Sequence, residues 1–181
     1  MKLSRADLKR DEVVFAVVRH GIKREQGDIA LMRFEQDLSI TRRLQYQTEA
    51  GKLLQGLGNT VAREMAPGRG FIGLTRIDLF SGTNNYVFAL TADGRQVGVT
   101  SYLRFTSDVV DQPPNRDRLR QRTFKQALTS AGFLYGIPRC SSPYCARAYA
   151  NNLDEHDAKA TEPCATCKAA FNKLFRRDVL F

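Results

Sequence analysis

The sequence predicts a mixed α/β (α+β) domain that carries a small cysteine-bearing subdomain near its C-terminal end. Its 181 residues, 43% of them hydrophobic, have the size and composition of one globular domain with a buried core. Apolar runs of strand length alternate with stretches in which apolar residues recur at the spacing of a helix. All four cysteines follow residue 139. We therefore expect a sheet-and-helix subdomain at 1–138 and a zinc-binding subdomain at 139–181, within one compact domain.

The first third of the chain predicts two strands and a helix. Residues 13–18 (VVFAVV) form a continuous apolar run, typical of a strand buried on both faces. Residues 40–46 alternate apolar and polar side chains, as in a half-exposed strand. Residues 48–65 predict a helix that a Pro-Gly pair at 67 and 68 would end. The side chains at helical spacing in this stretch are Leu53, Leu54, Leu57, Val61 and Met65.

Strands are predicted next at 71–80, 85–91 and 96–103, the last two joined by an Asp-Gly hairpin turn at positions 93 and 94. After a proline-containing breaker, residues 116–135 predict a helix, and 165–177 predict a closing one. The expected buried face of the longer helix consists of Leu119, Phe124, Ala127, Leu128, Ala131 and Tyr135.

The chain is strongly basic, with 28 Lys and Arg against 19 Asp and Glu, a net charge of +9. Residues 101–150 hold eight basic and three acidic side chains, and so carry +5 of this excess. The densest group opens the predicted helix and consists of Arg116, Arg118, Arg120, Arg122 and Lys125. A solvated helix face is one interpretation. The other interpretation is a binding site for an anionic partner, either nucleic acid or an acidic protein, because basic residues in a first turn oppose the helix dipole and need another source of stabilisation.

The four cysteines have the spacing of a metal site. Cys140 and Cys145 form a C-x4-C pair, and eighteen residues later Cys164 and Cys167 form a C-x2-C pair. Two disulfides or free core cysteines are the alternatives. The charged N-terminal stretch does not resemble a secretory signal, so we expect a cytoplasmic, reducing location that disfavours disulfides. Four thiolates would close the shell of one structural zinc ion, which leaves nearby His156 as an expected solvent-exposed side chain.

Other catalytic motifs are weak. The chain contains only two histidines, so a catalytic or metal site built from three histidines is excluded. A G-x-G-x-x-G match at 68–73 follows a predicted helix and opens a strand, which is the reverse of the dinucleotide-binding arrangement. Ser101 and Ser130 have no histidine base nearby in sequence. We therefore expect no nucleophile–base pair.

The cysteine region, from GIPRC at 136–140 through CARAYANNL at 145–153 to CATC at 164–167, resembles the archaemetzincins. These are metzincin-type zinc peptidases whose motif HExxHxxGxxHC is followed by xxxxCxM and a later CxxC. Upstream, the segments DLF at 78–80 and V-x-S-x-x-R at 99–104 match the family's strands. The similarity covers about residues 71–168 and implies a zincin/metzincin-like fold: a mixed twisted sheet, an active-site-type helix and the cysteine subdomain.

The resemblance also assigns the positions of the catalytic motif. With the motif's cysteine on the first cysteine of this chain, the family's three zinc-binding histidines fall on Thr129, Phe133 and Arg139. The catalytic glutamate falls on Ser130, and the turn methionine falls on Arg147. Catalytic zinc needs three neutral or anionic ligands and a base for its water. We therefore expect no enzymatic activity, and we expect Phe133 to fill the space of the metal.

A protease-dead, CarG-like branch of the family acts in bacterial transcription-factor complexes, so the resemblance implies a pseudoprotease that works through protein–protein interaction. The candidate docking residues for an acidic partner surface are Arg104, Arg116, Arg118, Arg120, Arg122 and Lys125. Direct nucleic-acid binding through the same basic side chains is the alternative, and metallopeptidase activity is a remote one.

Overall fold

The computed structural model describes residues 12–19, 33–35, 41–42, 47–65, 69–92, 96–107 and 112–175. Within these residues, no helix is both long and apolar enough to cross a membrane. The predicted turns at 67–68 and 93–94, and residues 43–46 of a predicted strand, lie outside this part of the chain.

A five-stranded mixed sheet forms the centre of the molecule, in the order β2-β1-β5-β8-β7. Strands β5 and β8 run parallel, and the other three neighbouring pairs are antiparallel. The strands are β1 (Glu12–Arg19), β2 (Arg33–Glu35), β5 (Arg69–Thr75), β7 (Ala89–Ala92) and β8 (Val97–Ser101). The predicted strand at 13–18 is confirmed and lies inside the sheet, between β2 and β5.

A smaller sheet, in the order β3-β4-β6, stands beside the first. It consists of β3 (Thr41–Arg42), β4 (Gln47–Glu49) and β6 (Asp78–Phe80). The single strand predicted at 71–80 is therefore wrong, because β5 and β6 belong to different sheets. The chain turns where the Thr75 hydroxyl accepts a hydrogen bond from the backbone N–H of Ile77 at 3.1 Å.

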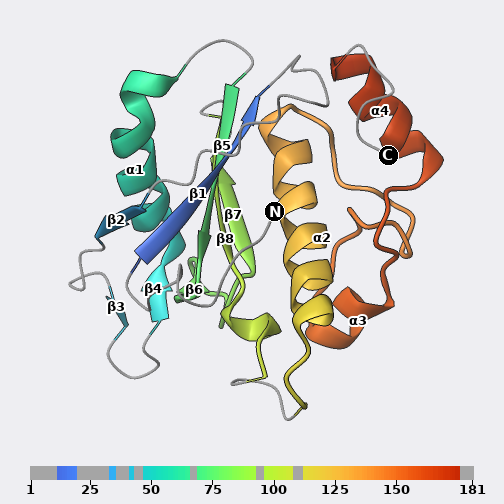
Figure 1. Cartoon of the computed structure of the whole chain (residues 1–181), viewed down its shortest axis with the longest axis horizontal. Coiled ribbons are helices and arrows are strands. Elements are labelled where there is room, and N and C mark those ends of the chain that lie inside the picture. Colours follow the sequence, from blue (N-terminus) through green and yellow to red (C-terminus); the bar gives the residue numbers. More distant parts are fainter. Residues whose placement is uncertain are drawn as a thin grey trace.

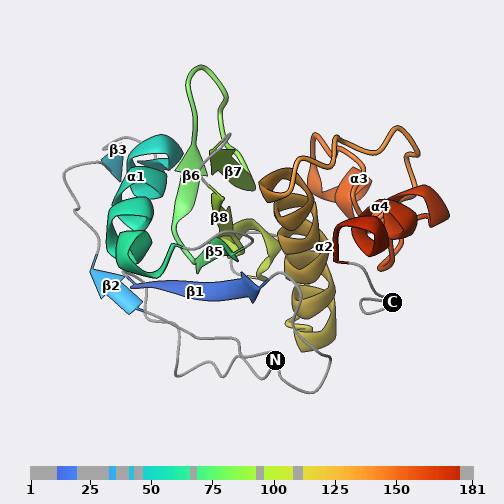
Figure 2. The same cartoon turned by 90° about the horizontal axis from the view of Figure 1, so that it is seen from above.

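Helices cover the large sheet on both faces. In Figures 1 and 2, α1 lies on one face, α2 on the other, and α3 and α4 stand beyond α2. The helical elements are α1 (Ala50–Val61), η4 (Ala62–Glu64), η5 (Leu103–Phe105), α2 (Arg116–Leu134), α3 (Leu153–Ala158) and α4 (Ala165–Phe175). This arrangement confirms the predicted mixed α/β fold with a cysteine-bearing region at its C-terminal side.

The apolar core is divided by the sheet. On the α1 side, Leu53, Leu57 and Val61 pack against Phe71 and Val99. On the α2 side, smaller clusters join the helix to the strands and, separately, to the cysteine-bearing region. The sheet supplies a rigid platform, and the two faces of α2 connect that platform to the C-terminal region.

Two predicted helix faces need correction. Met65 was expected on the buried face of the first helix, but it lies beyond α1 and η4 and is exposed. Phe124 was expected on the buried face of α2, yet it is 52% exposed. Because α2 is covered on two sides, it buries polar residues as well as apolar ones, and a single apolar stripe is a poor guide to its orientation.

Candidate functional site

Helix α2 and the turn after it position the residues of interest. The Asn115 side chain caps the N-terminus by accepting from the backbone N–H of Arg118. At the other end, Gly136 adopts a left-handed conformation (φ +72°). Its N–H donates to the Phe133 carbonyl at 3.0 Å, and the Ile137 N–H donates to the Gly132 carbonyl at 2.8 Å. These two hydrogen bonds cap the C-terminus of α2 and reverse the direction of the chain, so the next residues run back beside the helix.

The four cysteines meet as predicted from their spacing. The Sγ atoms of Cys140, Cys145, Cys164 and Cys167 lie within 4.8 Å of one another, and those of Cys140 and Cys164 are 3.6 Å apart. Tetrahedral zinc with Zn–S bonds of about 2.3 Å places sulfurs about 3.8 Å apart. The cluster therefore has the geometry and the soft donor set that suit a zinc ion.

Hydrogen-bond donors surround these sulfurs. The Cys145 Sγ accepts from the backbone N–H groups of Arg147 and Cys164, at 3.4 and 3.3 Å. The backbone N–H of Cys167 lowers the pKa of Cys164 to about 7, whereas burial raises the pKa of Cys167 to about 12. Such donors stabilise thiolates, and a bound cation would hold all four sulfurs in that form.

Arg147 is buried directly against the cluster. One guanidinium nitrogen lies 3.5 Å from the Cys167 Sγ, and another donates to the Ile137 carbonyl at 2.7 Å. The guanidinium also lies over the Phe171 ring, 5.3 Å from its centroid. Zinc with four thiolates carries a net negative charge, so a buried cation beside it is electrostatically compatible with the metal site.

A hollow of about 390 Å³ lies beside α2, against β7 and residues 148–151. Thr129, Ser130, Phe133 and Arg139, the four positions that the resemblance places at the catalytic zinc, all line it. In the part of the chain that the structure describes, the cysteine cluster is the one group of three or more metal-binding side chains that comes together. The hollow and the cysteine cluster are therefore chemically distinct sites.

Two of these lining side chains are tied into the fold. The Thr129 hydroxyl donates to the Lys125 carbonyl at 3.0 Å, and the Ser130 and Thr100 hydroxyls share a 3.2 Å hydrogen bond. Phe133 is half-buried and lines the hollow, so the expectation that it fills the space of the metal stays a prediction.

Arg139 is held by aromatic rings. Its guanidinium carbon lies 4.3 Å from the Tyr149 ring centroid and 5.7 Å from that of Phe133. A backbone bridge between Cys140 and Ala148 brings the two segments together. This bridge is one residue away from both Arg139 and Tyr149, and it links the cysteine cluster to the wall of the hollow.

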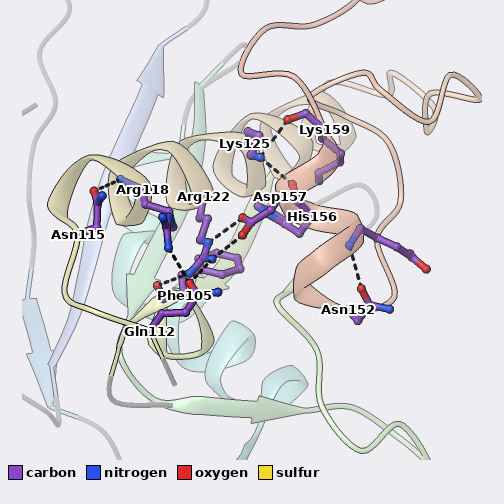
Figure 3. A network of polar contacts seen from close by, with 11 residues as sticks. Phe105, Gln112, Asn115, Arg118, Arg122, Lys125, Asn152, His156, Asp157 and Lys159 are labelled. Atoms are coloured by element: carbon purple, nitrogen blue, oxygen red, sulfur yellow. Dashed lines mark hydrogen bonds and ion pairs between the residues drawn. The ribbon is translucent and has the colours of Figure 1, made fainter. Parts of the chain in front are cut away.

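The predicted basic docking set divides into buried and exposed members. Arg122 is 2% exposed, because it forms an ion pair with Asp157 of α3 and donates to the Phe105 carbonyl. Lys125 is 3% exposed and donates to the carbonyls of His156 and Lys159, at 2.7 and 3.1 Å. Figure 3 shows both side chains pointing from α2 into these contacts. They join α2 to α3, and their inclusion in an accessible surface was wrong.

The remaining basic residues lie at the start of α2. Arg116, Arg118 and Arg120 are exposed, and Arg120 forms a surface ion pair with Asp117. Arg104 is held by both Asp78 carboxylate oxygens at 2.8 Å and lies over the Tyr86 ring. The contacts of Arg118 with Gln112 and of Arg120 with Asp117 lie at the surface, where an anionic partner can compete for them, whereas Arg104 is bound to the largely buried Asp78.

His156 is not the exposed side chain that the sequence suggested. It is 0% exposed, with Phe88 and Phe105 packed against its ring at centroid distances of 5.6 and 4.7 Å. Neither ring nitrogen has a hydrogen-bond partner among the described residues. Burial, followed by the charges of Lys159 and Lys125, lowers the pKa of this imidazole to about 3.

Acid is therefore expected to destabilise the protein through His156. In the unfolded chain this histidine takes a proton near pH 6.5, whereas the folded protein keeps it neutral down to about pH 3. Because protons favour the unfolded state across this window, the free energy of unfolding should fall by about 2 kcal/mol between pH 7 and pH 5. Urea titrations at both pH values should show that His156→Phe removes this part of the loss. A pH dependence of stability in the variant equal to that of the wild type would contradict this role of His156.

Comparisons of sequence agree with this geometry. A model of Peptidase family M54 matches residues 11–173. The archaemetzincin of Pyrococcus abyssi is 26% identical over 161 residues, which are 88% of this chain and 83% of that protein. The archaemetzincin of Pyrococcus horikoshii is 27% identical over 110 residues, 61% of this chain. In that match the chain spans 58% of the length of the relative.

Solved structures show the same fold. A zinc-dependent peptidase from Methanocorpusculum labreanum superposes with a TM-score of 0.69 at 22% identity, covering 76% of this chain and 81% of that one. An archaemetzincin from Methanopyrus kandleri gives a TM-score of 0.64 at 22% identity, with coverages of 79% and 74%. The sheet and helices of this chain are therefore arranged as in zinc-dependent peptidases.

Proposed function

Because the chain belongs to Peptidase family M54, and because its hollow is lined by side chains ill suited to hold a metal, we propose that it is a non-proteolytic archaemetzincin-like protein. It acts by binding a protein partner, in a bacterial transcription-regulatory complex. The supporting observation is the chemistry at four lining positions. Thr129 and Ser130 offer only hydroxyls, Phe133 offers no ligand atom, and Arg139 brings a cation.

Peptide hydrolysis by zinc needs a metal-bound water and a base to remove its proton. Among the described residues that line the hollow, neither requirement has a matching group: the Ser130 hydroxyl is hydrogen-bonded to Thr100, and none of these residues is a carboxylate. The cysteine cluster would bind one structural zinc through its four sulfurs, which leaves that ion without an open position for water. The metal would therefore stabilise the C-terminal region without taking part in hydrolysis.

The exposed start of α2 is the proposed docking surface for the partner. The first five residues of α2 include three exposed cations, Arg116, Arg118 and Arg120, and an acidic protein surface that meets this end of the helix is complementary to them. This surface is separate from the buried contacts of Arg122 and Lys125, so its charge can be changed without removing the junction between α2 and α3.

Two measurements test the proposal. Purified protein should contain about one zinc per chain and should leave unstructured peptide substrates intact when zinc is added. Affinity capture from the native host should recover a protein partner after nuclease treatment. The triple variant R116Q/R118Q/R120Q should lose that partner, whereas Arg63→Gln, an exposed change in η4, should keep it.

Other results would overturn parts of this assignment. Two zinc ions per chain together with peptide hydrolysis would return the protein to the peptidases. Capture that disappears with nuclease, accompanied by tight binding of duplex DNA that weakens steeply with salt, would favour the nucleic-acid alternative.

A further inference from the structure

The hollow beside α2 has features of a ligand site in its own right. At about 390 Å³ it falls within the size range of small-molecule pockets. Its walls are fixed by contacts between distant segments, since the Tyr86 hydroxyl donates to the Asn151 carbonyl at 2.8 Å. The Cys140–Ala148 bridge holds the other end of the same 148–151 segment. A preformed hollow of this kind loses little entropy when a ligand enters.

Arg139 presents unused hydrogen-bond donors to this hollow. Its guanidinium carbon lies over the Tyr149 ring and near that of Phe133, and these cation–π contacts involve no hydrogen bond. Within the described residues it makes no hydrogen bond or ion pair, although Arg122 and Arg104 both bind carboxylates. The N–H groups at its edge are therefore free to form a forked contact with an oxyanion.

The charge of the lining defines which oxyanion fits. Among the described residues that line the hollow, Arg139 alone has a formal charge, so this part of the site offers one positive charge. A carboxylate carries one negative charge and matches the planar guanidinium fork. A phosphate monoester carries nearly two charges and would need a second cation. The single arginine therefore favours a carboxylate.

The rest of the wall favours an apolar group next to that carboxylate. Phe133 lines the hollow from α2, Ala89 lines it from β7, and Ala148 and Tyr149 line it from the segment after the first cysteine pair. A ligand that joins one carboxylate to an apolar side group would pair its charge with Arg139 and bury its apolar part against these residues. The C-terminal residue of a protein chain has this chemistry.

We propose that the hollow binds the free C-terminal carboxylate of a peptide that ends in an apolar residue, with Arg139 as its anion-binding group. This inference rests on the proposed function, because it requires Arg139 and not a catalytic metal at the centre of the site. It adds to that function the chemical class of ligand that the hollow recognises. This ligand site is separate from the docking surface formed by the arginines at the start of α2.

The test uses the whole 181-residue chain and two probes that differ only in their C-terminal group, N-acetyl-Leu-Phe as the negatively charged free acid and as the neutral amide. Calorimetry should show that the acid binds at least tenfold more tightly than the amide. Arg139→Gln should remove this preference, and Arg139→Lys should restore part of it, because lysine keeps the charge without the planar fork. Arg63→Gln, on an exposed turn away from the hollow, should bind the acid like the wild type.

The outcomes separate this inference from the proposed function. Equal affinity for acid and amide, or a preference that survives Arg139→Gln, would overturn the carboxylate site. Tighter binding of phenyl phosphate than of the acid would overturn the choice of anion. Mass spectrometry of a longer acid probe after incubation reports hydrolysis independently, so cleavage would refute the non-proteolytic function and absence of binding would refute only this site.

Discussion

Loss of the cluster thiolates is expected to unfold the region that follows α2 while the sheet stays folded. In Cys167→Ser, a buried sulfur of the proposed zinc site is replaced by a poor ligand for zinc. Zinc binding to four-ligand structural sites contributes about 10–16 kcal/mol, and this binding energy acts as folding energy. The small apolar cluster around Ala146 and Phe171 is too limited to replace it. Hydrogen exchange should therefore show lost protection at residues 139–175, with protection retained in β5 and β8.

Metal removal should give the same pattern without any substitution. A strong chelator should release about one zinc per chain and expose the same residues to exchange. Ser141→Ala is the matched control, because Ser141 is exposed and adjacent to the cluster but contributes no sulfur. Full protection of 139–175 in the metal-free protein would contradict a structural role for the ion.

Gly132→Ala is expected to destabilise the protein by about 3 kcal/mol, although the same change in an ordinary helix interior stabilises by about 1 kcal/mol. A methyl group at Gly132 would lie 2.1 Å from one guanidinium nitrogen of Arg147. That guanidinium has little room to move, because it is fully buried and bound to the Ile137 carbonyl. Urea denaturation of the two proteins measures the difference.

A double-mutant cycle separates this clash from a general helix effect. Arg147→Met removes the guanidinium, so Gly132→Ala should cost much less in the Arg147→Met background, with a coupling energy of at least about 2 kcal/mol. Gly58→Ala in α1 is the control, since nothing lies within 4 Å of the added methyl and the change should be neutral or stabilising. Additive effects at Gly132 and Arg147 would refute the close approach.

Local sequence signals were sufficient for most elements of the fold. Helix α2 begins at Arg116, as predicted, because Asn115 supplies a side-chain cap and prolines precede it. It ends within one residue of the predicted end because Gly136 allows the left-handed turn. The cysteine cluster could be predicted because two short pairs of one residue type define a metal site without knowledge of the chain between them.

The buried polar residues could not be predicted in the same way. In the sequence, Arg122 and Lys125 look like part of a solvent-facing basic run. Their partners, Asp157 and two backbone carbonyls, come from α3 and the residue after it, more than 30 residues later in the chain. His156 lies between charged neighbours in sequence, yet its ring packs on Phe88 and Phe105. Local pattern carries no information about such long-range partners. One sequence signal could have predicted part of this packing. Gly132 lies inside a long helix, and a glycine in such a position indicates that another group packs closely against the helix.

If both proposed sites bind their ligands, the bridge between Cys140 and Ala148 would make the two binding equilibria depend on each other. Cys140 contributes to the sulfur cluster, and the residue before it, Arg139, contributes to the hollow. A metal ion bound at the cluster would order the backbone that holds Arg139 against Tyr149, so metal-loaded protein should bind a carboxylate more tightly than metal-depleted protein. By reciprocity, a carboxylate in the hollow must then raise the affinity for the metal by the same factor. Metal supply would thereby set the fraction of molecules competent to bind ligand.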